Sequence, residues 1–209
     1  MSEVKVRGKA AKTASYSLAL ATTEEKNESL LLIADQIVED QSEIIAANEK
    51  DLESGRKNGL DQSVLDRIML NEERISAMAE AIKLLVDLHD PIGEVLENSE
   101  LDNGLLVEKV RVPIGVVGMI YEARPNVTID AATLSLKTNN AVMLRGSSSA
   151  IHSNMALVKS IHRALEKSSL PTDAVQLIED TSRETAKELF QLNEFLDVLI
   201  PRGGKNLID

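Results

Sequence analysis

The sequence predicts an α/β protein in which a helical N-terminal region and a β-hairpin arm precede a doubly wound parallel sheet. Three observations predict this fold class. Apolar residues recur at helical spacing in residues 1–92, an Asn-Gly turn joins two alternating runs in 93–112, and strand-like apolar runs alternate with helical segments in 113–209. Strands separated by such segments pair in parallel, because a parallel connection needs a crossover of a dozen or more residues.

The composition is that of an ordinary globular chain with an acidic surface. Its 209 residues are 43% hydrophobic and 27% charged, enough for the core of one domain or of a domain and a half. The formal net charge is -11 and aromatic residues make up 2%, so neither phosphate attraction nor base stacking favours a nucleic-acid partner.

The sequence also lacks signals for membrane insertion, secretion and cysteine chemistry. No run approaches the roughly 18 apolar residues of a membrane span, and the N-terminal residues lack the apolar core of a secretory signal. We therefore expect a cytoplasmic protein without a membrane partner. The chain contains no cysteine, which excludes disulfides, thiolate metal sites and a cysteine nucleophile within these residues.

Helices are predicted in the N-terminal region from periodicity and capping signals. Leu and Ile residues share one face in 30–37, and a longer stretch follows the i, i+3, i+4, i+7 pattern. That stretch comprises Ile75, Met78, Ala79, Ile82, Leu85 and Val86. Thr22 followed by Glu25 fits a capping box, and Asn71 is placed to cap a helix that begins with two acidic residues.

A β-hairpin is predicted where Asp102, Asn103 and Gly104 separate the alternating runs 94–101 and 105–112. Asn-Gly between such runs is a strong hairpin signal. An isolated hairpin is marginally stable in water, so this one must pack on its own domain or on a second subunit. Of these two alternatives, we favour association with a second subunit.

Four short apolar runs after Pro113 predict the strands of the sheet: 115–120, 141–145, 174–178 and 197–201. Helices are predicted between them over 129–137, 151–165 and 181–192. Continuous apolar runs of this length are typical of strands buried on both faces. Residues 203–209 look like the first turn of a further helix, which predicts that the chain is a fragment of a longer protein.

Three arginines follow three of the four predicted strands: Arg124, Arg145 and Arg202. The carboxyl ends of parallel strands open onto one edge of a sheet, and ligands bind in the crevice outside that edge. Cations gathered there in an acidic chain predict a small anionic ligand, because a local cluster holds phosphate groups even where the overall field repels polyanions.

The loop after the second strand adds small residues to its cation. Arg145, Gly146, Ser147 and Ser148 stand at a predicted helix N-terminus, where unpaired N–H groups favour an anion. Binding of a phosphate or a ribose is one interpretation of this loop. The alternative is a serine-capped helix with an exposed arginine.

Two further loops carry candidate ligand-binding residues. Pro201, Arg202, Gly203 and Gly204 let a ligand approach the backbone just before the expected last helix. Asn126, after the first strand, is either an amide donor to a ligand or a helix cap.

Other chemistries find little support in the sequence. Neither glycine loop is a GxGxxG or Walker motif, and the stretch RGSSSA does not match the GxSxG of a serine nucleophile. His89, His152 and His162 show no metal-ligand spacing, so no metal site is predicted.

The stretches YEARPN, LRGSS, LPTDAVQLIEDTSRE and IPRGG occur in this order. Together with the helical start they closely resemble the gamma-glutamyl phosphate reductase family of the aldehyde dehydrogenase superfamily, and the resemblance runs through the whole chain. It implies an aldehyde dehydrogenase-like fold. Residues 1–92 would form the helical part of a cofactor-binding domain, 93–112 an oligomerisation arm, and 113–209 an α/β dinucleotide-binding domain before a catalytic domain with a cysteine nucleophile.

The resemblance also implies an activity, the NADPH-dependent reduction of L-glutamyl 5-phosphate to L-glutamate 5-semialdehyde and phosphate in proline biosynthesis. A thiolate displaces phosphate, and hydride from the nicotinamide then reduces the thioester. Because this chain lacks the family's cysteine, we expect it to be inactive alone. The resemblance further implies a homo-oligomer formed through the arm and an association with glutamate 5-kinase.

Residue roles are carried over from the family by position. Arg145 matches a lysine beside the adenosine ribose, and Gly146, Ser147 and Ser148 follow in the same loop. NAD-preferring relatives place an acid where this chain has Ser148, so the resemblance implies a preference for NADPH. The loop 201–204 matches the segment nearer the pyrophosphate.

The resemblance leaves two candidates for the residue at the oxyanion hole. Asn126 corresponds to the asparagine of the oxyanion hole, or Arg124 takes that position if the alignment shifts by two residues. A noncatalytic phosphate-ligand or association module is the alternative for the chain as a whole. A flavodoxin-like receiver domain is disfavoured, because no strand end carries paired acids.

Overall fold

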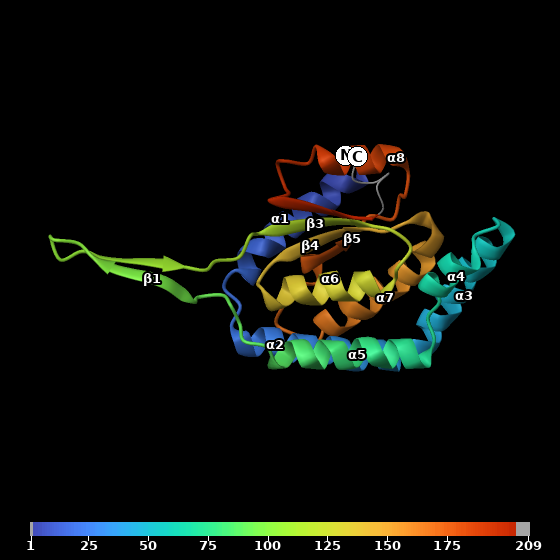
Figure 1. Cartoon of the computed structure of the whole chain (residues 1–209), viewed down its shortest axis with the longest axis horizontal. Helices are drawn as coiled ribbons and strands as arrows, with labels where there is room; N and C mark the ends of the chain where they lie inside the picture. The colour runs from blue at the N-terminus through green and yellow to red at the C-terminus, as the bar shows by residue number, and fades with distance from the viewer. Residues whose placement is uncertain (1, 204–209) are drawn as a thin grey trace.

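The computed structural model describes residues 2–203, which form an α/β fold with a parallel sheet (Figure 1). The N-terminal region forms α1 (Glu3–Leu18), α2 (Thr23–Glu39), α3 (Gln41–Lys57), α4 (Gln62–Ile68) and α5 (Glu72–Asp87). The hairpin consists of β1 (Val95–Glu100) and β2 (Leu106–Val110). The remaining elements are β3 (Val116–Tyr121), α6 (Asn126–Lys137), β4 (Ala141–Arg145), η1 (Ser148–Ala150), α7 (Ile151–Leu165), η2 (Thr172–Ala174), β5 (Val175–Leu177), α8 (Arg183–Phe190) and β6 (Val198–Arg202).

The strands of the main sheet are parallel and lie in the order β5-β4-β3-β6. The chain moves outward from β3 through β4 to β5 and then returns to β6 on the other side of β3. Helices α6 and α7 cover one face, whereas α1 and α8 lie on the other face (Figure 1). The sheet is therefore doubly wound, as the sequence predicted.

The N-terminal helices share one hydrophobic core with the sheet. Helix α1 packs directly on the sheet, while α2 and α5 form a further layer beyond α6 and α7. The helical periodicity predicted which residues are buried on α2 and α5: Leu30, Ile33, Ile37, Ile75, Met78, Ala79 and Ile82. This burial fixes α5 alongside α6, where the site described below lies.

Both predicted capping signals are confirmed. The Thr22 hydroxyl accepts a hydrogen bond from the Glu25 N–H at 3.2 Å, and the Glu25 carboxylate accepts one from the Thr22 N–H at 2.7 Å. Asn71 Oδ1 accepts from the Arg74 N–H at 2.8 Å. Each bond satisfies a backbone donor that an uncapped helix leaves unpaired.

Two helix boundaries differ from the prediction. Helix α6 begins at Asn126 rather than at residue 129, because Pro125 already has helical dihedral angles and starts the turn. Helix α8 is shorter than the predicted 181–192, because the Ser182 side chain caps its first turn by accepting from the Thr185 N–H.

The hairpin extends away from the body of the molecule (Figure 1). At its tip, the Gly104 N–H donates to Leu101 O at 2.8 Å, and the Leu101 N–H donates to Leu105 O at 2.9 Å. Gly104 has a φ of 81°, the left-handed conformation that closes a three-residue hairpin loop. Every residue of β1 and β2 is exposed, so the arm does not pack on the described part of its own chain.

No helix within residues 2–203 is both long and apolar enough to cross a membrane.

The helical turn predicted after Gly203 lies outside the described residues, and so does the predicted ligand residue Gly204.

Candidate functional site

The topological switch point of the sheet lies between β3 and β6. The chain leaves β3 for α6 on one face, whereas it enters β6 from α8 on the other face. Open α/β sheets bind ligands outside the carboxyl ends of the strands at such a point. A pocket of about 350 Å³ opens there, which we call the switch-point pocket. It is lined by Arg67, Tyr121, Glu122, Arg124, Val127, Arg202 and Gly203.

Three arginines converge on the switch-point pocket. Arg124 and Arg202 follow β3 and β6, as the sequence predicted, whereas Arg67 comes from the last turn of α4. No sequence pattern indicated Arg67, because the local pattern of a helix does not show where its end will pack.

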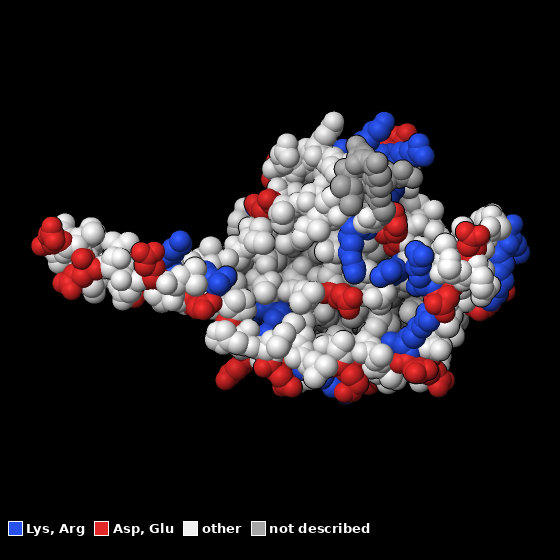
Figure 2. All heavy atoms as spheres, in the orientation of Figure 1, with Lys and Arg blue, Asp and Glu red and all other residues white. Residues whose placement is uncertain are grey.

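The three arginines of the switch-point pocket are exposed, and none forms an ion pair with a carboxylate of residues 2–203. In Figure 2, Lys and Arg side chains gather around a hollow on the half of the body away from the hairpin. Exposed guanidinium groups bind phosphate oxygens through charge-assisted bonds that are often bidentate. The pocket therefore has the chemistry of a phosphate site.

Arg145 lies at the same level of the sheet but outside this pocket. Ile120 of β3 pairs with Arg145 on one side and with Pro201 on the other, so those two residues are about 9.6 Å apart, two strand spacings. The Arg145 guanidinium reaches the loop before α8, where Nη2 donates to Thr181 O at 2.7 Å and to Ser182 O at 2.9 Å.

The structure corrects the expectation of an exposed arginine at this position. Arg145 is half-buried, and burial lowers the pKa of its guanidinium, an effect that the charge of Asp180 opposes. Its Nε atom is buried and has no hydrogen-bond partner among the described residues. Buried donors are almost always paired, so this unpaired N–H is unusual.

The loop after β4 is shaped by close packing at Gly146. A Cβ atom there would lie 2.2 Å from Asn154 Nδ2, so no larger residue fits without a shift. The Ser147 hydroxyl accepts from the Ser149 N–H at 3.3 Å and caps η1, as the capping interpretation predicted. Ser148 is exposed beside them.

A buried polar chain supports the site from below. The Tyr121 hydroxyl lies 2.7 Å from Thr128 Oγ1, which donates to Asn154 Oδ1 at 2.9 Å. Burial raises the pKa of Tyr121, against the lowering effect of its bond with Thr128, so the phenol stays neutral. The chain of bonds joins β3, α6 and α7 directly behind the switch-point pocket.

Asn126 does not cap α6. Pro125 occupies the cap position, and the Asn126 side chain instead donates from Nδ2 to Asp130 Oδ2 at 3.3 Å. Burial raises the pKa of Asp130, while the charge of Arg202 and the bond from Asn126 oppose that rise. The helix-cap interpretation of Asn126 is thus wrong, and its amide lies next to a half-buried carboxylate.

An apolar groove between α5 and α6 adjoins the switch-point pocket and shares Val127 and Arg202 with it. Its volume is about 520 Å³, and its apolar lining includes Met78, Ala81, Leu84, Leu88 and Leu134. Asp130 and Arg202 are the charged residues that line it. The pocket and the groove together form a crevice along α6 with cations at one end and a carboxylate further along.

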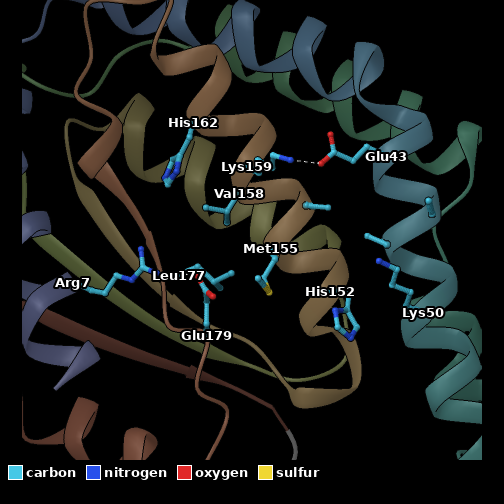
Figure 3. Close-up of a pocket in the computed structure, with 13 residues that line it drawn as sticks. Arg7, Glu43, Lys50, His152, Met155, Val158, Lys159, His162, Leu177 and Glu179 are labelled. Atoms are coloured by element: carbon cyan, nitrogen blue, oxygen red, sulfur yellow. Dashed lines mark hydrogen bonds and ion pairs between the residues drawn. The ribbon is translucent and has the colours of Figure 1, made fainter.

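A separate cavity of about 470 Å³ lies between α3 and α7, as Figure 3 shows. Its charged groups are largely engaged with one another: Arg7 pairs with Glu179 at 2.9 Å, and Lys159 pairs with Glu43 at 2.6 Å. This cavity differs from the switch-point pocket, where the arginines form no ion pair with a carboxylate of the described residues. Within residues 2–203, no cluster of three or more His, Asp or Glu side chains could hold a metal ion.

A doubly wound sheet with cations at its switch point defines a class of α/β proteins that bind phosphate-bearing ligands. Residues 2–199 match the aldehyde dehydrogenase family, and the chain belongs to that family.

Several curated relatives of this chain are gamma-glutamyl phosphate reductases. The chain is 63% identical over 209 residues to the gamma-glutamyl phosphate reductase of Bacillus subtilis and 61% identical to that of Oceanobacillus iheyensis. Each match covers 100% of this chain and 50% of the relative, so the chain spans about half the length of these curated relatives.

Two solved structures of gamma-glutamyl phosphate reductase superpose on this chain. The gamma-glutamyl phosphate reductase of Thermotoga maritima superposes with a TM-score of 0.98 at 42% identity, over 99% of this chain and 50% of that one. The Saccharomyces cerevisiae enzyme superposes with a TM-score of 0.89 at 29% identity, over 100% of this chain and 53% of that one.

Proposed function

We propose that this chain supplies the cofactor-binding half of an NADPH-dependent reductase that converts L-glutamyl 5-phosphate to L-glutamate 5-semialdehyde and phosphate. The relatives named above support the reaction. The unpaired arginines at the switch point carry the proposal, because they favour a ligand with several phosphate oxygens.

The residues of the strand-end loops fit a dinucleotide. We assign the pyrophosphate to Arg202, Gly203 and the adjoining residues of the loop 201–204, and the ribose with its 2′-phosphate to the loop 145–148. The orphaned Nε of Arg145 and the exposed Ser148 are suited to that second role. When bound, the cofactor supplies the hydride.

Two residues are candidates for stabilising the oxyanion that forms at the reacting carbonyl. Arg124 lines the switch-point pocket and brings a positive charge, whereas Asn126 offers an amide donor at the start of α6. Either group would lower the barrier by pairing with charge that develops in the transition state. The thiolate must come from outside these residues, because the chain has no cysteine.

Titration calorimetry of the chain with NADPH tests this function directly. We expect binding that Arg202→Ala weakens about tenfold, the effect of losing one charge-assisted bond. The chain alone is expected to show no reduction of NADP with glutamate 5-semialdehyde and phosphate. Joining residues 1–209 to the second half of the Bacillus subtilis relative should restore that turnover, and a chimera that folds without activity would contradict the proposal.

Cofactor choice is tested at Ser148. Glutamate at this position would repel the 2′-phosphate by about 1 kcal/mol or more if the two charges lie within several ångströms. In the chimera, Ser148→Glu should therefore lower the preference for NADPH over NADH. An unchanged preference would show that Ser148 does not face the 2′ position.

We also propose that the hairpin arm joins subunits into a homo-oligomer. Its exposed apolar residues include Leu106 and Val107, which an isolated arm would leave in water. Replacing both by lysine should dissociate the oligomer in sedimentation experiments. The equally drastic change Leu20→Lys, at a residue 85% exposed outside the arm, should not. We further propose a cytoplasmic location and an association with glutamate 5-kinase, both of which rest on the proposed reaction.

The absence of cysteine favours one alternative, a noncatalytic module that binds a phosphate-bearing ligand or another subunit. The chimera separates the two functions. A module without a reductase partner would bind NADPH weakly or not at all and would give no turnover when joined to the second half of a relative.

A further inference from the structure

Asp130 lines the apolar groove and also an adjoining pocket of about 360 Å³, whose lining includes Asn126, Arg67 and Arg74. It lies on α6 one turn beyond Asn126 and lines the groove together with Met78 and Ala81 of α5. It forms no ion pair with a described cation, and it accepts a hydrogen bond of 3.3 Å from the Asn126 amide. A half-buried carboxylate with so little compensation is costly for the folded chain.

The environment of Asp130 selects the charge of a ligand. Arg202 lines the same groove and influences the carboxylate through its charge, but the two do not make an ion pair. The other groove residues bring no positive charge, and in the adjoining pocket Arg74 is paired with Asp66, whereas Arg67 forms no ion pair with a described carboxylate. A ligand that reaches Asp130 is therefore bound best if it carries a cationic hydrogen-bond donor there.

The spacing of the charges selects the shape of the ligand. From Asn126 to Asp130, α6 rises by roughly 6 Å, and Arg124 stands just before that segment. A ligand with an anionic group among the arginines and a cationic group at Asp130 must hold the two roughly this far apart. An amino acid whose side chain ends in an acyl phosphate has its ammonium and its phosphoryl group separated by about 7 Å when extended.

We propose that Asp130 binds the ammonium group of a zwitterionic amino-acid substrate, whose phosphorylated end lies at Arg67 and Arg124 of the switch-point pocket, while Arg202 binds the cofactor pyrophosphate. This proposal rests on the proposed function and names a residue that distinguishes amino-acid substrates from plain acyl phosphates and aldehydes. Asn126 holds the Asp130 carboxylate in place through the bond from its amide. The apolar groove wall excludes water and so strengthens the attraction between carboxylate and ammonium.

The test compares two aldehydes in the reverse reaction of the chimera, with NADP and phosphate present. One is glutamate 5-semialdehyde, and the other is 5-oxopentanoate, which has the same carbon chain without the ammonium. Asp130→Asn should lower kcat/KM for the amino-bearing aldehyde by roughly 10- to 100-fold, the range for losing a charged hydrogen bond. It should leave kcat/KM for 5-oxopentanoate unchanged or raised.

Two control variants keep the test sharp. Asp130→Glu retains the charge and should retain part of the discrimination, while Asp61→Asn removes a charge from an exposed residue and should change neither rate. An equal loss of rate for both aldehydes would make Asp130 a structural residue and overturn the proposal, as would discrimination that survives Asp130→Asn. A chimera without turnover for either aldehyde would instead count against the proposed function.

Discussion

The two edges of the parallel sheet use their polar residues in opposite ways. At the amino edge, where the strands begin, charged and amide groups are paired with one another, and those around Lys26 are largely buried. At the carboxyl edge, Arg67, Arg124 and Arg202 are exposed and form no ion pair with a described carboxylate, and the acid beside them is only weakly compensated. The contrast separates groups that stabilise the fold from groups that are kept available for a ligand.

The amino edge is built around Lys26, which is 1% exposed. Its Nζ donates to the carboxylate of Asp90 and to the side-chain oxygen of Asn139, and Thr23 adds a hydrogen bond to Asp90 at 2.6 Å. Asn139 in turn donates to backbone carbonyls of α1 and of the segment that follows it. This cluster ties α1, α2 and the base of the hairpin to the start of β4.

A second cluster at the same edge joins β3 and β6. Asp197 accepts from the Val116 N–H at 2.8 Å and pairs with Lys12 of α1 at 2.8 Å. Asn140 Oδ1 accepts from the Gly115 N–H at 2.9 Å. These bonds satisfy backbone groups at the strand starts, so this edge has few polar groups left for a ligand.

The largest effect is expected at Lys26. Lys26→Met leaves the buried Asp90 without its cation, which costs about 3 to 5 kcal/mol in the free energy of unfolding. Urea denaturation measures the loss. Lys83→Met is the matched control, because Lys83 pairs with Glu80 at the surface and such pairs contribute about 0 to 1 kcal/mol. Similar losses for both lysines would remove the distinction between buried and exposed pairs.

The next effect is expected at Gly115, which has a φ of 120°. A Cβ atom there would lie 2.3 Å from Asp197 Oδ2 and would disturb the bond to the Val116 N–H. Gly115→Ala should therefore cost about 2 to 4 kcal/mol, from backbone strain and crowding together. Gly59→Ala has strain without crowding, since nothing lies within 4 Å of its Cβ position, and should cost about 1 to 2 kcal/mol in the same denaturation experiment.

At the carboxyl edge, we expect substitutions to change stability little and activity strongly. Arg124→Ala and Arg67→Ala remove exposed side chains without ion-pair partners, so each should change the free energy of unfolding by less than about 0.5 kcal/mol. In the chimera, the same changes should lower kcat/KM for the reverse reaction about tenfold or more. A loss of stability as large as that at Lys26 would show that these arginines are structural.

The smallest expected effect is on the pH dependence of stability, which should differ between Asp90 at the amino edge and Asp130 near the carboxyl edge. Burial by itself raises the pKa of Asp90, but hydrogen bonds from Lys26, Thr23 and the Ile92 N–H outweigh it, so the pKa lies below the ordinary value of 3.8. A carboxyl group whose pKa is lowered by folding stabilises the fold at pH values above its unfolded-state pKa. This stabilisation is lost as the pH falls through its folded-state pKa. Asp90→Asn should therefore be less stable than the parent at pH 7, by an amount that shrinks in acid.

For Asp130, the contribution of the ionised carboxylate to stability has the opposite sign. Its pKa is raised by burial above 3.8, so ionising it opposes folding at neutral pH and has no effect once the carboxyl is protonated in both states. Asp130→Asn should make the chain more stable at pH 7, by up to about 1 kcal/mol, with the gain vanishing as the pH falls below the folded pKa. Denaturation at pH 7 and at pH values around 3.8 checks both variants, and the same sign for both would break the comparison of the two edges.

Much of the fold follows from local patterns. The predicted helix 151–165 coincides with α7, the capping signals lie at the starts of α2 and α5, and apolar runs mark the strands. From parallel pairing the sequence also places Arg124 and Arg202 at one edge. These features depend on side-chain spacing within an element, which the sequence displays directly.

Only the tertiary structure decided which polar groups face a ligand and which face each other. Lys26 and Asp90 are 64 residues apart, and nothing near either one indicates that burial will bring them together. In the sequence, Arg145 follows a strand as Arg124 and Arg202 do, but its side chain donates to carbonyls of the loop before α8. Arg67 of α4 lines the switch-point pocket, although it follows no strand. The physical reason is that the partner of a charged side chain is set by the packing of distant elements, whereas periodicity reports only the face on which that side chain lies.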